Sequence, residues 1–237
     1  MDGSPPVGRI PELRLPAVAM YVMRVELHDD LAAGGCPICR GATRSTRAWL
    51  LDLLREIDDF RVQEALDRDG GLCPSHVRRL LDVARESDDS LGLGIVLEHL
   101  LRNAFIPVTG PPRRSVRLGG SRRIPPAPTA DRCAACKAQQ VRIDAYLEIL
   151  LDASDAATHE LAHRPENALC KAHLQLALAR RTHDRTAPLE RAARLHVRSL
   201  IDRVRTSQRA HTYGSTADRG VHEVLWRDAP DWLAGRR

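Results

Sequence analysis

Two kinds of short motif carry the residues of this chain that could do chemistry. The segments GLCPSH, residues 71–76, and ALCKAH, residues 168–173, each place a cysteine three positions before a histidine. The segments CPIC, residues 36–39, and CAAC, residues 133–136, each place two cysteines three positions apart. Each motif recurs after 97 positions, and together the motifs use all six cysteines of the chain. A fixed offset of this kind is typical of an internal duplication, which we therefore predict.

Thiolate and imidazole groups at these spacings are typical of tetrahedral zinc sites. A Cys-x-x-Cys pair holds two sulfurs close enough to bind one ion, and a second pair from elsewhere in the chain completes the shell. Pro74 suits the first position of a helix, where the positive end of the helix dipole also favours a thiolate. We expect two zinc ions per chain, each bound within one half of the sequence. The predicted ligands are Cys36, Cys39, Cys73 and His76 for one ion, and Cys133, Cys136, Cys170 and His173 for the other.

Other uses of the same residues fit the sequence less well. Structural disulfides would leave one thiol unpaired in each half, because each half holds three cysteines. A catalytic zinc keeps one position for water, whereas four protein ligands are available at each predicted site. No histidine is followed two positions later by glutamate, so the zinc deaminase signature is absent. Iron–sulfur clusters, and redox sensing through the thiolates, remain open alternatives.

Composition and periodicity predict that helices position these motifs. Of the 237 residues only 3% are aromatic, and Leu, Ala, Arg and Glu dominate the long segments, which favours helix over strand. Apolar residues recur at helical spacing after each motif and also before CPIC, where Val18, Tyr21, Val22 and Val25 predict a helix over about residues 15–31. We therefore expect an all-α protein of two pseudo-symmetric helical repeats, each organised by one Cys3His site.

The chain divides into five predicted parts. A flexible arm at 1–14 precedes the first zinc repeat at 15–106, and a linker at 107–130 leads to the second repeat at 131–212. The linker holds six prolines, three glycines and five arginines without one acidic residue, a composition typical of an extended segment. A C-terminal tail at 213–237 contains two of the three tryptophans, and we expect it to dock back onto the helices.

The motifs resemble those of an uncharacterised bacterial family, a domain of unknown function with duplicated CPxC and GxCxxH zinc-ligand motifs. Trp49 and Tyr146, each followed by leucine, match the family's aromatic–leucine pair, and LGLGIVLEHLL matches its helix that opens on Leu-Gly and ends on His-Leu. The chain departs from the pattern at Ala134, where the family has proline, and at Ala168, where it has glycine. The resemblance covers about residues 15–205. It implies two zinc-ligand repeats and brings no activity with it.

A second group of polar residues is the candidate for a site of another kind. The offset of 97 positions pairs His99 with His196, and apolar neighbours place both near the core side of their helices. With Glu98, Glu26 and His28 they could bind a ligand or a further metal in a cleft between the repeats. The competing interpretation is that both are hydrogen-bonded core histidines. An enzyme or small-molecule binder that uses this cleft is therefore our alternative functional prediction.

Charge and hydropathy narrow the class of partner. The formal net charge is +5, a mild excess, and the arginines of the linker have no interleaved aromatic residues on which bases could stack. A nucleic-acid partner is thus weakly supported. The apolar run before CPIC lacks a cleavage site, and no stretch is long enough to span a membrane, so we expect a cytoplasmic protein. The sequence favours a zinc-binding scaffold or binding module for a protein or small molecule, and it does not decide whether the chain is an enzyme.

Overall fold

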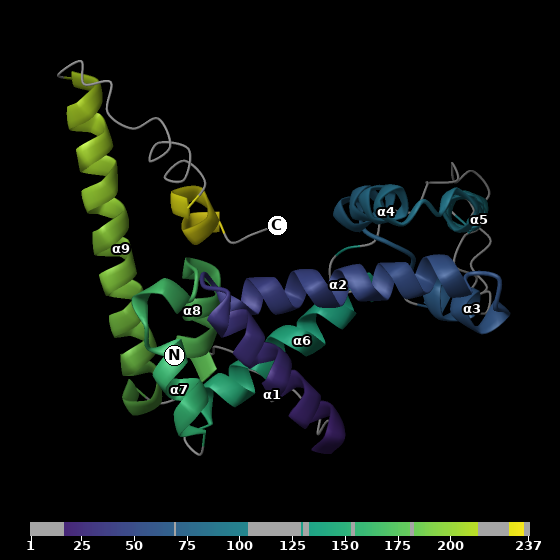
Figure 1. Ribbon diagram of the computed structural model, residues 1–237. Helices are drawn as coiled ribbons and strands as arrows, with labels where there is room; N and C mark the ends of the chain where they lie inside the picture. The colour runs from purple at the N-terminus through teal and green to yellow at the C-terminus, as the bar shows by residue number, and fades with distance from the viewer. Residues whose placement is uncertain are drawn as a thin grey trace, which may run out of the picture.

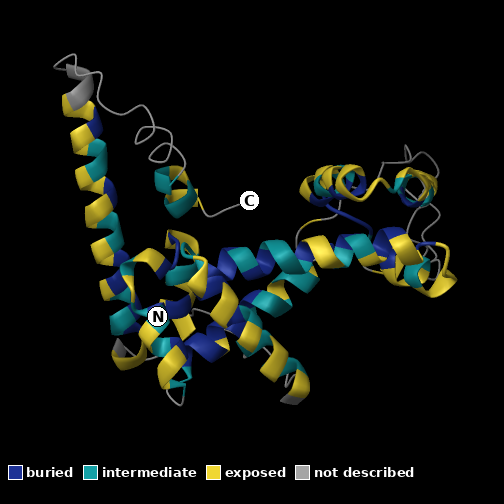
Figure 2. Ribbon diagram, viewed as in Figure 1, coloured by how far each residue is buried: buried dark blue, intermediate teal, exposed yellow. Residues whose placement is uncertain are grey.

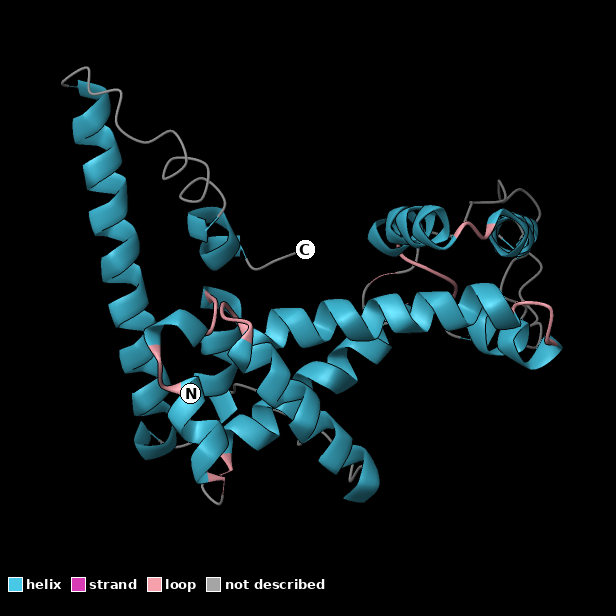
Figure 3. Ribbon diagram, in the orientation of Figure 1, coloured by secondary structure: helices cyan, strands magenta, loops and turns pink. Residues whose placement is uncertain are grey.

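The computed structural model describes residues 17–68, 70–103, 129, 133–152, 155–180, 183–212 and 228–234. The predicted arm at 1–14 and nearly all of the predicted linker at 107–130 lie outside the described residues. Within the described ranges every regular element is a helix and no strand occurs (Figure 3), so the prediction of an all-α protein is confirmed. None of these described helices combines the length and apolar character needed to cross a bilayer.

Ten labelled helical segments make up most of the described chain. A further short helix at 228–234 belongs to the predicted C-terminal tail. In chain order the labelled helices are α1 (Ala17–Ala32), α2 (Pro37–Glu56), α3 (Phe60–Arg68), α4 (Pro74–Ser87), α5 (Ser90–Asn103), α6 (Ala134–Leu151), α7 (Ala156–Ala162), the 3₁₀ turn η1 (Pro165–Asn167), α8 (Lys171–Arg180) and α9 (His183–Thr212).

Helices α2 and α6 pack along each other at the centre of the molecule (Figure 1). They run in opposite directions, because Gly41 near the start of α2 meets Tyr146 in the second half of α6, whereas Ser45, further along α2, donates to the Ala138 carbonyl near the start of α6. The other helices gather at the two ends of this pair. We call α1, α7, η1, α8 and α9 the α1 lobe, and α3, α4 and α5 the α4 lobe (Figure 1).

Each lobe has its own apolar core, and both halves of the sequence contribute to each one (Figure 2). In the α1 lobe, Leu27 and Leu31 of α1 pack with Tyr146 and Leu150 of α6. In the α4 lobe, the buried leucines of α2 pack with α4 and with Ala135 at the start of α6. Fully burying one such leucine stabilises the fold by about 1.5–3 kcal/mol. Neither lobe can therefore be completed by one half of the chain alone.

Local sequence explains where the motif-bearing helices start. Cys36 and Cys73 are extended N-cap residues, and the prolines that follow them occupy the first helical position, where a missing amide hydrogen costs nothing. Gly34 and Gly35, with φ of +74° and +73°, form the turn that leads from α1 into Cys36. Residues that carry a side chain rarely adopt this left-handed backbone conformation, whereas glycine does so readily. The turn therefore delivers the first cysteine to the start of α2.

The face of α1 that packs into the core is not the apolar stripe from which the sequence predicted this helix. The predicted helix at about 15–31 agrees with the observed Ala17–Ala32. However, the stripe of Val18, Tyr21, Val22 and Val25 is exposed, with 47–76% of each residue accessible to solvent. The face that enters the core carries Leu27 and Leu31, which are 0% and 1% exposed, with Met20 and Met23 packed beside them.

Candidate metal centres

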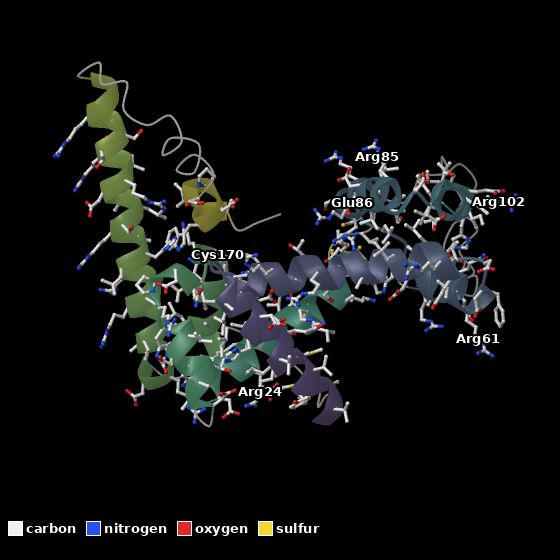
Figure 4. The ribbon with its side chains drawn as sticks, in the orientation of Figure 1. Arg24, Arg61, Arg85, Glu86, Arg102 and Cys170 are labelled. Carbon is white, nitrogen blue, oxygen red and sulfur yellow. The ribbon has the colours of Figure 1, made fainter. Side chains whose placement is uncertain are left out.

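The first cluster of predicted ligands forms where the start of α2 meets the start of α8. Cys36 and Cys39 come from α2, and Cys170 and His173 come from the first turn of α8. The Nδ1 atom of His173 lies 3.5 Å from Cys36 Sγ, 3.3 Å from Cys39 Sγ and 3.2 Å from Cys170 Sγ. Figure 4 shows Cys170 at this junction. We call these four residues cluster A.

The second cluster forms where the start of α6 meets the start of α4. Cys133 and Cys136 come from α6, and Cys73 and His76 come from α4. The Nδ1 atom of His76 lies 3.3 Å from Cys73 Sγ, 3.4 Å from Cys133 Sγ and 3.3 Å from Cys136 Sγ. These four residues are cluster B. Each cluster thus offers three sulfurs and one imidazole nitrogen, all within 4.8 Å of one another.

The prediction that each site takes all its ligands from one half of the chain is wrong. The structure exchanges the pairs, so that Cys36 and Cys39 meet Cys170 and His173 in place of Cys73 and His76. The reason is the length of α2: its 20 residues extend about 30 Å, and α3 and α4 follow at its far end. The antiparallel α6 brings the second CxxC motif to that far end. Spacing along the sequence could not reveal this exchange.

Both motifs use the first turn of a helix to aim two donors at one point. A cysteine at the N-cap and a second donor three positions later lie on the same face of the first turn. Neither Cys36, Cys73 nor Cys133 makes a side-chain capping hydrogen bond, so the sulfurs are not used to cap their helices. The same local geometry therefore serves CxxC at α2 and α6 and CxxH at α4 and α8.

The distances between donors fit a single tetrahedral ion. With Zn–S of about 2.3 Å and Zn–N of about 2.0–2.1 Å, a regular tetrahedron places two sulfurs about 3.8 Å apart and a sulfur and a nitrogen about 3.6 Å apart. Cys39 and Cys170 are 3.7 Å apart, Cys73 and Cys136 are 3.8 Å apart, and the sulfur–nitrogen distances are slightly shorter. The donor set therefore suits one divalent ion per cluster.

The pKa values of the cysteine thiols also favour the binding of a cation at each cluster. Desolvation, reinforced by neighbouring thiols, raises the pKa of Cys36 well above its usual range and that of Cys136 to about 12. Hydrogen bonds from Cys36 and Cys39 hold the pKa of Cys170 far below its usual range. Burial opposes ionisation of Cys73, yet the Ser75 hydroxyl and the His76 amide lower its pKa. The thiolate is thus favoured at Cys170 and Cys73, whereas Cys36 and Cys136 resist ionisation unless a positive ion compensates their charge.

The cysteines of cluster A also shift the pKa of its histidine, His173. Burial disfavours a charged imidazole, but hydrogen bonds with Cys170 and Cys39 and the charge of these sulfurs raise the pKa of His173 to about 9. Without a metal, a proton on His173 compensates the Cys170 thiolate. An incoming divalent ion would displace this proton and those of the remaining thiols, so binding would release protons.

The two clusters differ in their surroundings. Cluster A borders a pocket of about 530 Å³, lined by three of its cysteines together with residues of α9 and of the 228–234 helix. Cys36 and His173 are partly exposed, whereas in cluster B only Cys136 is. Three residues of α9, His196, Ser199 and Arg203, face the cluster A pocket. The cluster A side of the molecule is the more open one.

The second predicted group is not brought together. His99 and Glu98 lie on α5 in the α4 lobe, where His99 Nε2 is 2.8 Å from Asp67 Oδ1. His196 lies on α9 at the opposite end of the α2–α6 pair and hydrogen-bonds the Pro165 backbone (Figure 1). Glu26 pairs with Arg142, and His28 is exposed on α1. A joint site of His99 and His196 is therefore wrong, although His196 does line a pocket.

Several residues that support cluster A were not predicted from the sequence. Arg40 Nε donates to the Gly34 carbonyl at 2.7 Å, and the Gly35 amide donates to the Glu166 carbonyl at 2.6 Å, which together join the loop before Cys36 to the loop before Cys170. Asp30 accepts a hydrogen bond of 2.9 Å from the Tyr146 hydroxyl and pairs with Arg44. A polar residue on the buried face of α1 was the only available sign.

No family model matches this chain, and neither the curated proteins nor the solved structures contain a match. The resemblance to the bacterial family of duplicated zinc-ligand motifs therefore stays a prediction.

Proposed function

We propose that this chain is a zinc-binding helical protein in which two structural zinc ions tie its two halves together, and that it serves as a binding or scaffold module. The observation that carries the proposal is the exchange of ligand pairs, which makes each ion a cross-link between the start of a helix in one half and the start of a helix in the other. Closed sites with four protein ligands contribute folding energy and leave no position for a reacting water.

Zinc is supported over an iron–sulfur cluster by the compactness of the donors. All four donor atoms of each cluster lie within 4.8 Å of one another, a space that suits one ion. A polynuclear cluster places several metal and sulfide atoms between its ligands and needs a wider cage. Three thiolates and an imidazole are also a ligand set that zinc commonly takes.

The internal duplication is part of the proposal. Helix α6 begins 97 residues after α2, and α8 begins 97 residues after α4, the same offset that relates the motifs. We infer two repeats, at 15–106 and 131–212, that exchange their CxxH motifs around the α2–α6 pair. In this arrangement the zinc ions set the position of the lobes relative to the central helices.

Metal analysis and reversible chelation test the structural role. Purified protein is expected to contain two zinc ions per chain, and a strong chelator is expected to remove helical circular dichroism as well as metal, with both restored by added zinc. The decisive variant is Cys73→Ser. If it kept its fold and cooperativity but lost a biochemical activity, the structural role would be wrong. Visible absorption typical of an iron–sulfur cluster would reject zinc.

One pocket favours a second candidate function, the binding of a small anion beside cluster A. Two buried donors at this pocket, Arg203 Nε and Trp232 Nε1, have no hydrogen-bond partner among the described residues, although Arg203 Nη1 donates to Asp228 at 3.1 Å. Buried donors are normally paired, so acceptor oxygens of a carboxylate or phosphate would suit them. Calorimetric titration with inorganic phosphate and with citrate, on the wild type and on Arg203→Gln, tests this function. Absence of binding heat for the wild type would reject it.

A further inference from the structure

Helix α1 fills a groove formed by α2, α6 and α7 in the α1 lobe. Leu27 and Leu31 enter the core there. The groove holds α1 with polar contacts as well: Asp30 accepts from Tyr146, and Arg44 pairs with the same carboxylate. Arg40 donates to the carbonyl groups of Ala33 and Gly34 at the end of the helix.

The 97-residue offset relates this groove to an open one in the α4 lobe. Trp49 corresponds to Tyr146, and Lys137, Ala138 and Val141 correspond to Arg40, Gly41 and Arg44. All four of these counterparts line a groove of about 440 Å³ between α2, α3 and α6. By the same offset α3 corresponds to α7, so the open groove is built from the counterparts of the three helices that hold α1. We call it the α2–α3–α6 groove.

The sequence shows no second copy of the α1 pattern at the position that the offset predicts. The positions 97 residues after α1 are 114–129, whose sequence has two adjacent glycines and three prolines in place of an amphipathic pattern. The apolar surface of the groove comes from Trp49, Leu53, Val62, Ala65, Ala138 and Val141. A groove of this shape and lining suits one apolar face of a helix.

Among the described residues, one face of α1 has no helix packed against it. The α1 outer stripe, which consists of Val18, Tyr21, Val22 and Val25, follows the i, i+3, i+4, i+7 spacing of a helix that docks by one side. Val18 and Tyr21 are 76% and 69% exposed, even though the opposite face of α1 is buried in the core. Isolated apolar residues are common on surfaces, but a contiguous helical stripe indicates an interaction site.

We propose that two copies of this chain form a two-fold dimer in which the α1 outer stripe of each copy lies in the α2–α3–α6 groove of the other. A two-fold axis pairs each patch with its complement twice, so one association event covers both apolar surfaces of both copies. A stable interface covers about 800 Å² on each partner. Two patches per chain approach that requirement better than one helical stripe does.

Charge supports this occupant of the groove. The first nine residues of α1, Ala17–Val25, contain one charged side chain, Arg24, and a helix N-terminus is itself partly positive. The rim that α2 contributes to the groove carries Asp52 and Glu56, whereas α3 and α6 contribute Arg61 and Lys137, and all four are exposed. The α2 side of the rim would therefore attract the start of α1 of the second copy, whereas the basic residues of α3 and α6 would not.

Light scattering after size-exclusion chromatography of the zinc-loaded full chain tests the dimer. The wild type is expected at twice its 26.3 kDa chain mass over a dilution series. Tyr21→Glu on the stripe and Ala65→Glu in the groove should each raise the dimer dissociation constant about 10-fold or more, because a carboxylate would lose its hydration in a mainly apolar contact. Asp52→Arg together with Glu56→Arg should weaken the dimer less.

Controls separate docking from folding. Tyr21 and Ala65 are both exposed, so the single variants should keep two zinc ions and the helical circular dichroism of the wild type. Leu101→Glu changes a residue on α5 that is 67% exposed, comparable with Tyr21 but outside both patches, and should leave the dimer intact.

A mixture of the two variants distinguishes this arrangement from a dimer through α1 alone. In a mixed dimer of Tyr21→Glu with Ala65→Glu, both changes fall in one stripe–groove contact and the other contact is intact. The mixture should therefore associate more tightly than either variant alone. A monomeric wild type, or a dimer unaffected by Ala65→Glu, would overturn the proposal.

Discussion

Clusters A and B hold the same donors at the same spacing, but the protein covers them differently. Cluster B is enclosed by the α4 lobe, where Cys73, His76 and Cys133 are buried. Beside cluster A, helix α1 fills the groove between α2, α6 and α7, whereas the corresponding groove in the α4 lobe is open. The sulfurs of cluster A nevertheless border a pocket under α9. The ligand pattern therefore specifies which donors meet, whereas the helices packed around each motif specify how accessible a bound ion would be.

Loss of a ligand should have the largest effect, and it should not be confined to one half. Cys39→Ser and Cys73→Ser are each expected to lower the zinc content from two ions to one and to destabilise both lobes, since the ligands of each cluster come from both halves. One structural zinc site provides up to about 10–16 kcal/mol of apparent binding free energy in small zinc-finger peptides. Zinc analysis and thermal unfolding of the two variants measure the effect.

Fragments of the two halves give the sharpest test of whether each zinc ion needs ligands from both halves. A fragment of residues 15–106 contains one complete CxxC and CxxH set but cannot form either observed cluster. It should bind zinc weakly until it is mixed with a fragment of residues 131–212. Tight binding of one zinc by the first fragment alone would show that ligand exchange between the halves is not required.

A larger side chain at Gly41, where α2 meets α6, should cost more stability than one at its counterpart Ala138. The added methyl group in Gly41→Ala would lie 2.4 Å from a ring carbon of Tyr146, which is fully buried, so helix or ring must shift. Overpacking of this kind costs about 1–3 kcal/mol. Ala138→Ser, at the corresponding position in the open groove, should change the free energy of unfolding by less than about 0.5 kcal/mol. Chemical denaturation compares the two, and equal costs would contradict the difference in packing.

The accessibility of the clusters predicts the order of zinc release. We expect two phases on addition of excess chelator, with cluster A releasing its ion about 10-fold faster, a difference of about 1.4 kcal/mol in barrier. The reason is the partial exposure of Cys36 and His173 at the pocket. Stopped-flow measurement with a colorimetric chelator resolves the phases, and Cys73→Ser, which retains only cluster A, identifies the fast one. Release in the opposite order would reject the comparison.

The smallest effects are expected at the two histidines outside the clusters. His99→Ala removes a partly exposed pair with Asp67 and should cost under about 1 kcal/mol. His196→Ala removes a hydrogen bond to the Pro165 backbone and should cost a similar amount. Both variants should keep two zinc ions per chain. If His196→Ala lowered the zinc content, the pocket under α9 would be part of cluster A.

The sequence by itself determined which side chains can act as metal ligands and that the elements carrying them are helices. Cysteine and histidine three residues apart can meet on one helical turn whatever surrounds them, because the geometry of the turn is local. For the same reason Pro37 and Pro74 mark the helix starts correctly. The helical period also placed α1 within two residues of its observed bounds at each end.

Only the tertiary structure decided which motifs meet and which faces are buried. The choice between Cys73 and Cys170 as the partner of Cys36 depends on the antiparallel packing of α2 and α6, which no local spacing encodes. The outer stripe of α1 is as apolar as a core face, yet Leu27 and Leu31 enter the core, on the face of α1 where Asp30 accepts from the Tyr146 hydroxyl. Apolar periodicity reports that a helix has a preferred face, but the partner that covers this face is set by the arrangement of helices in space.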